Sequence, residues 1–303
     1  LKSQTDNIAK EDAYTLALFA QDEIKLLRNL QALIGVRYIY HENFKNHATP
    51  NVALMYKPGK FNFRASYAAG FRTPTLSELY ATDIAKKNDR LTIGNLDLKP
   101  EKNNYFSLSA EYVHERFSVS VNAFYNNIRD MIDYNTIATG DKAMEQYGHK
   151  EVRQRDNIAE AKVHGINVSA NAYLGAGFNL SGGYTHLNTQ DVELEQPIDK
   201  SIKNAYNINA QWAHSWKIYR LNINLNGRIN SKRFSKSYGY APEYQLWNLN
   251  TRHSFNLKSV IIEPGCGMEN LFDYMDDRPY NSNYATLTPG RSFYISLSLK
   301  FKS

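Results

Sequence analysis

The sequence predicts an all-β protein, an antiparallel transmembrane β-barrel, and three observations support this fold class. The last strand, within residues 291–301, alternates strictly, with its apolar side chains on one face and Ser, Tyr and Lys on the other. The same period of two recurs along the whole chain, in segments of the roughly 9–11 residues or more that a tilted strand needs to cross a bilayer. The second face carries Asn, Ser, Arg and Gln, so the interior is polar and the exterior apolar, as in an outer-membrane barrel.

The alternation predicts about thirteen strands. In chain order these are residues 12–25, 31–41, 49–57, 61–72, 102–114, 116–128, 155–174, 178–189, 202–214, 217–230, 244–257, 260–271 and 290–301. The fourth shows the pattern well, because Phe61, Phe63 and Tyr67 alternate with Asn62 and Arg64. We expect five arginines to face the lumen on such strands: Arg37, Arg64, Arg72, Arg228 and Arg252.

The predicted connections alternate between short and long. Tight turns are expected near residues 27–30, 57–60, 114–116, 174–177, 214–217 and 257–259, and longer connections near 41–49, 73–100, 133–154, 190–201, 231–242 and 272–289. Barrels of this class have short periplasmic turns and long outer loops, so Phe301 is expected on the periplasmic side. Single-chain bacterial barrels have an even number of strands. The odd count predicts that residues 1–303 are the C-terminal segment of a larger barrel.

Composition agrees with a barrel, although the mean hydropathy of −0.56 resembles that of a soluble protein. There is no run of about 18 apolar residues, so no membrane-spanning helix is expected. Aromatic residues make up 13% of the chain, 22 of them Tyr, a side chain that suits the bilayer interface. The single cysteine, Cys266, excludes an internal disulfide and is expected to be a lipid-facing or packed thiol.

Charge and motifs argue against several function classes. The net charge of +6 comes from scattered residues without a basic block, so no nucleic-acid partner is expected. No phosphate-binding loop, His-Glu-x-x-His or Gly-x-Ser-x-Gly motif is present. The neighbours His253 and Ser254 face opposite ways on a strand. We therefore predict no enzyme, no catalytic residue, no metal ligand set and no cofactor.

Several motifs, in a fixed order, resemble those of TonB-dependent outer-membrane receptors. Residues 70–80, Gly-Phe-Arg-Thr-Pro-Thr-Leu-Ser-Glu-Leu-Tyr, resemble the Phe-Arg-Ala-Pro box of that family, with Thr73 in place of Ala. Residues 95–101, Asn-Leu-Asp-Leu-Lys-Pro-Glu, are similar to the box that follows, with Leu96 in place of Pro. Residues 124–134, residues 269–274 (Glu-Asn-Leu-Phe-Asp-Tyr) and the terminal strand from Gly290 resemble three later family signatures.

The resemblance implies a 22-stranded barrel in the bacterial outer membrane, filled by an N-terminal plug. The plug and the first strands would not be in this chain. The implied partners are the TonB-ExbB-ExbD energy-transducing complex, reached through the missing part, the lipid and lipopolysaccharide of the membrane, and a small-molecule iron complex. A surface lipoprotein is a further candidate partner.

The iron complex is expected to be a siderophore or haem. Haem receptors of the family have a His between the two boxes, whereas residues 80–94 contain none and offer only Tyr80 as an axial ligand. His41, His47 and His149 lie in or beside other predicted outer loops.

Eight candidate ligand-binding residues follow from this reasoning. They are Arg72, Tyr80, His149, Arg155, Tyr238, Tyr240, Tyr280 and Tyr284. Arginine provides positive charge for anionic iron complexes, and Tyr can stack on and hydrogen-bond a ligand. The alternatives are salt bridges to the plug for the arginines and an interface belt or loop packing for the tyrosines. For His149, which forms a local basic cluster with Lys150, Arg153 and Arg155, the alternative is a solvated face. Asp276 and Asp277 are expected to form a turn.

Other functions remain open. A cobalamin receptor would carry the same boxes. A passive channel, or a small barrel enzyme complete in itself, would need an even number of strands. A structural pore for a surface lipoprotein would copurify with a second polypeptide.

Overall fold

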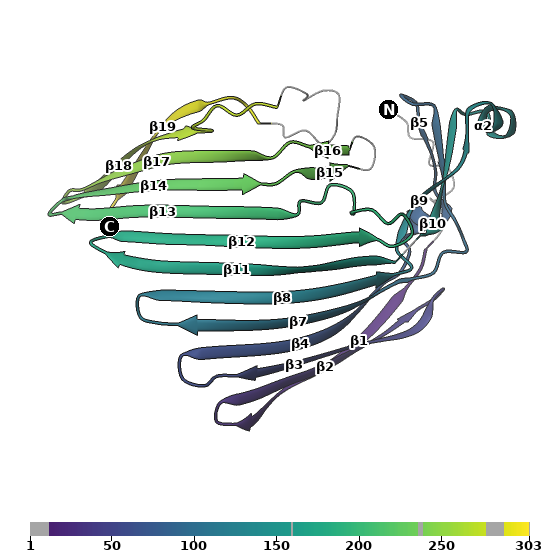
Figure 1. Ribbon diagram of the computed structural model, residues 1–303, viewed down its shortest axis with the longest axis horizontal. Coiled ribbons are helices and arrows are strands. Elements are labelled where there is room, and N and C mark those ends of the chain that lie inside the picture. Colours follow the sequence, from purple (N-terminus) through teal and green to yellow (C-terminus); the bar gives the residue numbers. More distant parts are fainter. Residues whose placement is uncertain (1–11, 159, 236–238, 277–287, 303) are drawn as a thin grey trace.

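The computed structural model describes residues 12–158, 160–235, 239–276 and 288–302, and it confirms the predicted fold class. Thirteen strands form one antiparallel sheet in chain order, curved into a wall that runs from β1 to β19 (Figure 1). The strands are β1 (Thr15–Leu27), β2 (Leu30–His41), β3 (Lys45–Tyr56), β4 (Phe61–Arg72), β7 (Glu101–Val113), β8 (Phe117–Arg129), β11 (Ala161–Gly175), β12 (Phe178–Asp191), β13 (Asn204–Trp216), β14 (Tyr219–Asn230), β17 (Tyr244–Asn256), β18 (Val260–Glu269) and β19 (Ser292–Phe301).

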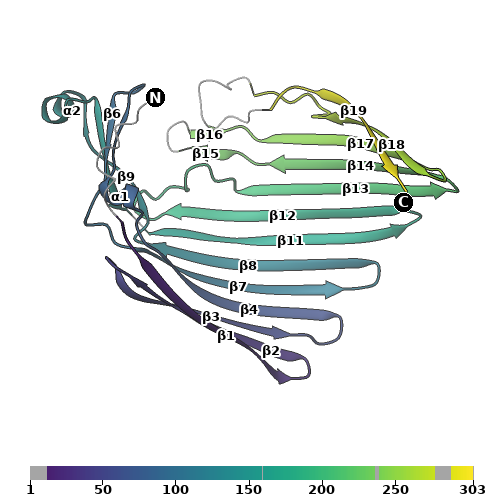
Figure 2. The ribbon, with the colours of Figure 1, turned by 180° about the vertical axis from the view of Figure 1, so that it is seen from behind.

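The wall is open, because β1 pairs only with β2 and β19 only with β18 in the part of the chain that the structure describes. Figure 2 shows the same arrangement from behind, with tight turns at one end of the strands and, apart from the short β2–β3 connection, long connections at the other. The turn between β11 and β12 uses left-handed backbone: Ala176 and Gly177 have φ of 50° and 86°. Two successive positive φ values match the right-handed twist of a hairpin.

The long connections contain further short elements, which the sequence analysis did not predict. These are α1 (Leu76–Tyr80), β5 (Thr82–Ala85), β6 (Arg90–Ile93), β9 (Ile132–Thr139), α2 (Gly140–Tyr147), β10 (Glu151–Asn157), β15 (Arg233–Ser235) and β16 (Gly239–Ala241).

Two predicted boundaries were wrong. The strand expected at 155–174 is divided, since β10 ends at Asn157 and β11 begins at Ala161. The connection expected to be long at 41–49 is short, because β3 already begins at Lys45, whose φ of 61° turns the chain sharply.

The outer face of the wall is a continuous apolar surface. One register row joins Leu54, Ala65, Leu108, Ala123 and Ile166 across five strands. Another joins Leu180, Ala210, Leu225, Leu249 and Met268. Large side chains on this face are extensively exposed, for example Leu108 at 63% and Ile295 at 88%. Exposing an apolar surface of this extent to water is unfavourable, whereas contact with the hydrocarbon of a bilayer is favourable.

The inner face is polar and forms hydrogen bonds between strands. Ser66 and Ser107 lie 2.6 Å apart between their hydroxyl oxygens, and Ser120 and Ser169 lie 2.7 Å apart. Farther along the wall, the Asn209 amide donates to Asn226 Oδ1. The outward and inward faces therefore have the inverted polarity that the strand pattern predicts.

Aromatic side chains gather at the tight-turn end of the outer face. Trp212, His214 and Trp216 follow one another on β13, with ring centroids 6.0 Å and 4.4 Å apart, and Trp216 stacks on Tyr219 of β14 at 5.5 Å. Rings with one apolar and one wet edge are enriched where a bilayer meets water. In the described residues, none of the helices has the length and apolarity required to span a membrane.

Candidate functional site

At the loop end of the wall, two long connections combine into a second, smaller sheet. Residues 73–100 supply β5 and β6, and residues 130–160 supply β9 and β10, in the order β5-β6-β10-β9. We call this the loop sheet. The parallel pairing of β6 with β10 joins the two connections, so that Arg90 lies beside Glu151 and Thr92 beside Arg153. In Figure 1 the loop sheet and α2 stand at the end of the wall, at a steep angle to its strands.

One face of the loop sheet is closed by α2. Val152 and Ala143 are fully buried, Ala138 is almost so, and Leu91 and Tyr147 pack against them. Because side chains alternate along a strand, the neighbours of Val152 point to the opposite face. That face is open and polar, and it holds three arginines.

The open face carries Arg90, Arg153 and Arg155 on two adjacent strands. Arg153 Nε donates to Glu151 Oε1 at 2.6 Å, and the Nε of Arg90 is buried without a hydrogen-bond partner in the part of the chain that the structure describes. The Arg155 guanidinium lies 3.6 Å above the Tyr134 ring and donates to its hydroxyl at 2.5 Å. A planar cation held on an aromatic ring is well oriented to bind an anion with its remaining donors.

His149 connects the two loops at the edge of the loop sheet. Its Nδ1 lies 2.8 Å from Asp89 Oδ1, and the Lys150 backbone N–H donates to the Asp89 carbonyl. The hydrogen bond from His149 holds the pKa of the Asp89 carboxyl below its ordinary value. The prediction of a solvated basic cluster missed this acid partner.

Arg72 lies at the base of both loops, between two carboxylates. Its guanidinium forms ion pairs with the carboxylate of Glu78, in α1, at 2.9 Å and with that of Glu101, at the start of β7, at 2.5 Å. Thr75 and Glu78 form a reciprocal capping box at the start of α1. Burial raises the pKa of the Glu78 carboxyl, but the hydrogen bonds from Arg72 and Thr75 outweigh it, so the pKa lies below the ordinary value of 4.5.

The structure does not bring the eight predicted residues into one cluster. Tyr80, at the end of α1, packs against the buried group Leu79, Leu98 and Ile132. Tyr240 is 57% exposed on the separate hairpin β15–β16 and lies against Phe234, with ring centroids 5.3 Å apart. Tyr238, Tyr280 and Tyr284 lie outside the described residues, as does Asp277.

Sequence reasoning missed Arg90 and Tyr134 as parts of the open face and treated Arg153 only as a basic neighbour of His149. Arg90 lies about sixty positions before Arg153, and only the pairing of β6 with β10 joins them. Tyr134 faces Arg155 because β9 and β10 pair in antiparallel register with an irregularity between Val152 and Arg153. No metal-binding group of three or more His, Cys, Asp or Glu side chains is found among the residues described.

Comparison with known proteins finds a matching family model and several similar receptors. A family model described as "TonB dependent receptor-like, beta-barrel" matches residues 2–271. The ferric enterobactin receptor of Pseudomonas aeruginosa is 23% identical over 97% of this chain and 43% of its own length.

Two solved structures show the same fold. A mutant of the ferric enterobactin receptor from Pseudomonas aeruginosa superposes with a TM-score of 0.77 at 20% identity, covering 96% of this chain and 45% of that one. The siderophore receptor PirA from Acinetobacter baumannii gives 0.75 at 17% identity, covering 99% and 48%. The chain thus spans less than half the length of these relatives.

Proposed function

The chain belongs to the TonB-dependent receptor-like β-barrel family, and on that premise we propose that it forms part of the wall and outer loops of a receptor that imports a ferric siderophore. It is a protein of the outer membrane. The relatives named above are receptors for ferric enterobactin and siderophores, which supports an iron complex as cargo. We propose transport without chemical change of the ligand.

The observation that carries this proposal is the open face of the loop sheet. Ferric complexes of acidic chelators are anionic, and Arg153 and Arg155 present guanidinium groups at the loop end of a polar-lined wall. Arg153 and Arg155 are only partly buried, so a ligand can reach them. We propose that the complex is captured here before it enters the lumen, with Tyr134 holding Arg155 in position.

The two open edges of the wall need partners. Unpaired N–H and C=O groups in hydrocarbon cost several kcal/mol each, so a lipid-embedded sheet must close. We propose that strands outside this chain pair with β1 and β19, and that a plug rests against the polar inner face. In the same proposal, coupling to TonB-ExbB-ExbD runs through that plug, and the long connections face the cell exterior.

The test uses the intact receptor in iron-starved cells. Uptake of radioactive iron bound to a catechol siderophore is measured with and without a protonophore, and haem and cobalamin are offered as competing ligands. We expect protonophore-sensitive uptake that excess haem and cobalamin do not inhibit. Energy-independent uptake, or steady ion conductance without uptake, would instead indicate a passive channel.

A variant series tests the open face itself. Arg153→Ala combined with Arg155→Ala is expected to weaken siderophore binding at least tenfold, because a hydrogen bond to a charged group contributes about 1.5–3 kcal/mol. The matched control, Arg28→Ala with Arg116→Ala, removes two exposed arginines at the tight turns and should leave affinity unchanged. Tyr134→Phe keeps the ring under Arg155 and should cost less affinity than Tyr134→Ala. Equal binding by the double variant and its control would refute the assigned capture face.

A further inference from the structure

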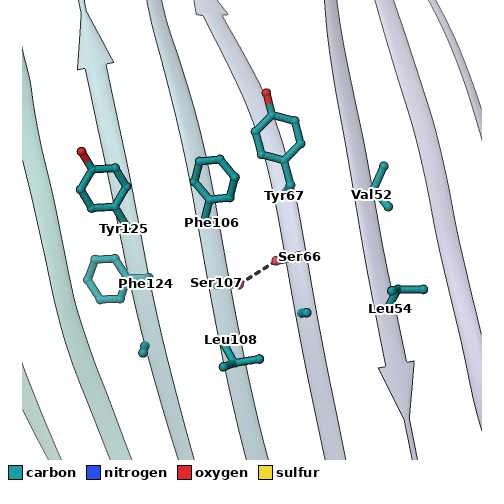
Figure 3. Close-up of a pocket in the computed structure, with 11 residues that line it drawn as sticks. Val52, Leu54, Ser66, Tyr67, Phe106, Ser107, Leu108, Phe124 and Tyr125 are labelled. Carbon is teal, nitrogen blue, oxygen red and sulfur yellow. Dashed lines mark hydrogen bonds between the residues drawn. The ribbon is translucent and has the colours of Figure 1, made fainter.

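A shallow groove of about 560 Å³ crosses β3, β4, β7 and β8 on the outer, apolar face of the wall (Figure 3). Its floor follows the register row in which Ala65 and Ala123 alternate with Leu54 and Leu108. The two small methyl groups leave space between their larger neighbours. The groove therefore has the apolar lining that a hydrocarbon chain lying along the wall requires.

Toward the loop end, the groove is bordered by a row of rings. Tyr67, Phe106 and Tyr125 are cross-strand neighbours and lie side by side in Figure 3. The Tyr67 and Phe106 ring centroids are 4.9 Å apart, and the Tyr67 hydroxyl donates to Asn104 at 2.8 Å. This row has the composition expected at the level where acyl chains meet headgroups.

The next row is polar and contains an unpartnered atom. Asn104 faces Asn127 across the β7–β8 pair. Asn127 is only 8% exposed, and its Oδ1 lacks a hydrogen-bond partner in the described residues. A buried amide oxygen without a donor is costly unless something outside the chain supplies one. This amide row separates the aromatic row from the charged side chains that follow it toward the loop end.

The following row places two cations opposite each other. Lys102 and Arg129 are direct cross-strand partners, both exposed, on the same face as the groove. Neither forms an ion pair or side-chain hydrogen bond within the described residues, whereas the neighbouring Lys162 is paired with Glu160 at 3.7 Å. Like charges directly opposite each other destabilise a sheet, and an anion bound between them would reverse the sign of that interaction.

We propose that this surface binds a phosphate-bearing membrane lipid, with an acyl chain in the groove and the headgroup phosphate between Lys102 and Arg129. The four residues from Phe106 to Lys102 span about 13 Å along the strand. The long aliphatic stems of Lys and Arg let their charged ends reach back toward the rings. The order of the rows, apolar, aromatic, amide and cationic, matches the order of chemical groups in such a lipid. The site lies on the face opposite to the lumen and is independent of siderophore capture.

The experiment is native mass spectrometry of the intact receptor in detergent. It is titrated with phosphatidic acid, which carries a phosphomonoester, and with phosphatidylcholine that has the same acyl chains. We expect phosphatidic acid to bind at least tenfold more tightly. Lys102→Ala combined with Arg129→Ala should abolish this preference. The control, Lys86→Ala with Lys87→Ala, removes two exposed loop lysines and should retain it. Equal binding of the two lipids by the unaltered receptor, or an unchanged preference in the Lys102/Arg129 variant, would overturn the proposal.

A second variant separates a lipid site from a simple phosphate site. Ala123→Trp fills the groove from the outer surface, so the barrel should still form, as judged by its heat-modifiable gel mobility. We expect it to weaken phosphatidic acid binding several-fold. Inorganic phosphate at millimolar concentration should displace little lipid from the unaltered receptor. Full displacement by inorganic phosphate, or undiminished binding by the folded Ala123→Trp protein, would show that no acyl chain occupies the groove.

Discussion

Arg72 and Glu101 face each other across β4 and β7 and form a two-pronged ion pair. Arg72 Nη2 lies 2.5 Å from Glu101 Oε1, and Nε lies 2.7 Å from Oε2. Glu101 Oε1 also accepts the backbone N–H of Ile132 at 2.9 Å. A single carboxylate thus ties the end of β4 to the start of β7 and the start of β9. The two sequence boxes that contain Arg72 and Glu101 hold the base of the loop sheet.

We expect Arg72→Ala to loosen both long connections without unfolding the wall. The change leaves Glu78 and Glu101 as neighbouring, partly buried carboxylates without their cation. Because the Arg72 side chain is 43% exposed and solvent screens its ion pairs, we expect the loops to be destabilised by only about 1–2 kcal/mol. That corresponds to roughly tenfold more frequent opening of the loops. Limited proteolysis of the intact receptor would measure it as faster cleavage within residues 73–100 and 130–160.

Arg64→Ala provides the matched control, because Arg64 lies on the same face of the same strand and pairs with no carboxylate in the described part of the chain. Its cleavage rate should equal that of the unaltered protein. If Arg72→Ala also cleaved at the unaltered rate, the ion pair would not be what holds the loops.

The Glu78 carboxyl should make the order of α1 dependent on pH. Its folded pKa is below the ordinary 4.5, so its contribution to stability is complete above about pH 4.5 and is lost as the pH falls through the lowered folded pKa. A spin label at the exposed position Ser77→Cys, in a Cys266→Ser background, would report this as increased mobility in acid. Glu78→Gln should make the label mobile at every pH, and a pH response that survived this change would have to come from another group.

The sequence predicted the wall well because each strand faces two solvents. Lipid outside and water inside impose a period of two on every crossing, and a slip of one residue would turn every side chain to the wrong face. The thirteen strands of the wall therefore match the expected ones, apart from their ends. The expected start of β11 at residue 155 was wrong because residues 155–157 pair within the loop sheet as the end of β10, and β11 begins only at Ala161.

The loop sheet could not be predicted in the same way. Its strands have four to eight residues, and its small core depends on contacts of Leu91 with Val152 that no local pattern encodes. His149 and Arg155 could be chosen by charge alone. Their partners Asp89 and Tyr134 follow from the pairing of strands that lie far apart in the chain or are separated by α2. Arg72 was predicted by motif, but its two carboxylate partners favour a role as a structural anchor over direct ligand contact.

Gly177 should be essential for assembly of the β11–β12 hairpin. Its φ is +86°, and a Cβ atom there would lie 1.9 Å from the Ala213 carbonyl oxygen, so Gly177→Ala combines backbone strain with a clash. At Gly59 φ is +63° and an added Cβ atom would meet no other atom, so Gly59→Ala introduces backbone strain without a clash. We expect Gly59→Ala to lower the stability of the folded barrel by about 1 kcal/mol and Gly177→Ala to lower it by several kcal/mol. The fraction of folded barrel on an unheated gel should fall markedly for Gly177→Ala only, and equal yields of the two variants would contradict the clash.

Cys266 offers a direct test of which face meets lipid. It is exposed, and its register partners are Thr251 and Ile295 on the apolar face. A spin label on this native thiol should be relaxed strongly by oxygen, which partitions into hydrocarbon, and weakly by a water-soluble nickel chelate. Ser120→Cys in a Cys266→Ser background is the control, because Ser120 lies on the polar face beside Ser169. Its label should be less accessible to oxygen than that at Cys266, and any access by the nickel chelate should be through the lumen. If the two labels showed the same ratio of oxygen to nickel accessibility, the assignment of the two faces would be wrong, and with it the groove proposed to hold a lipid.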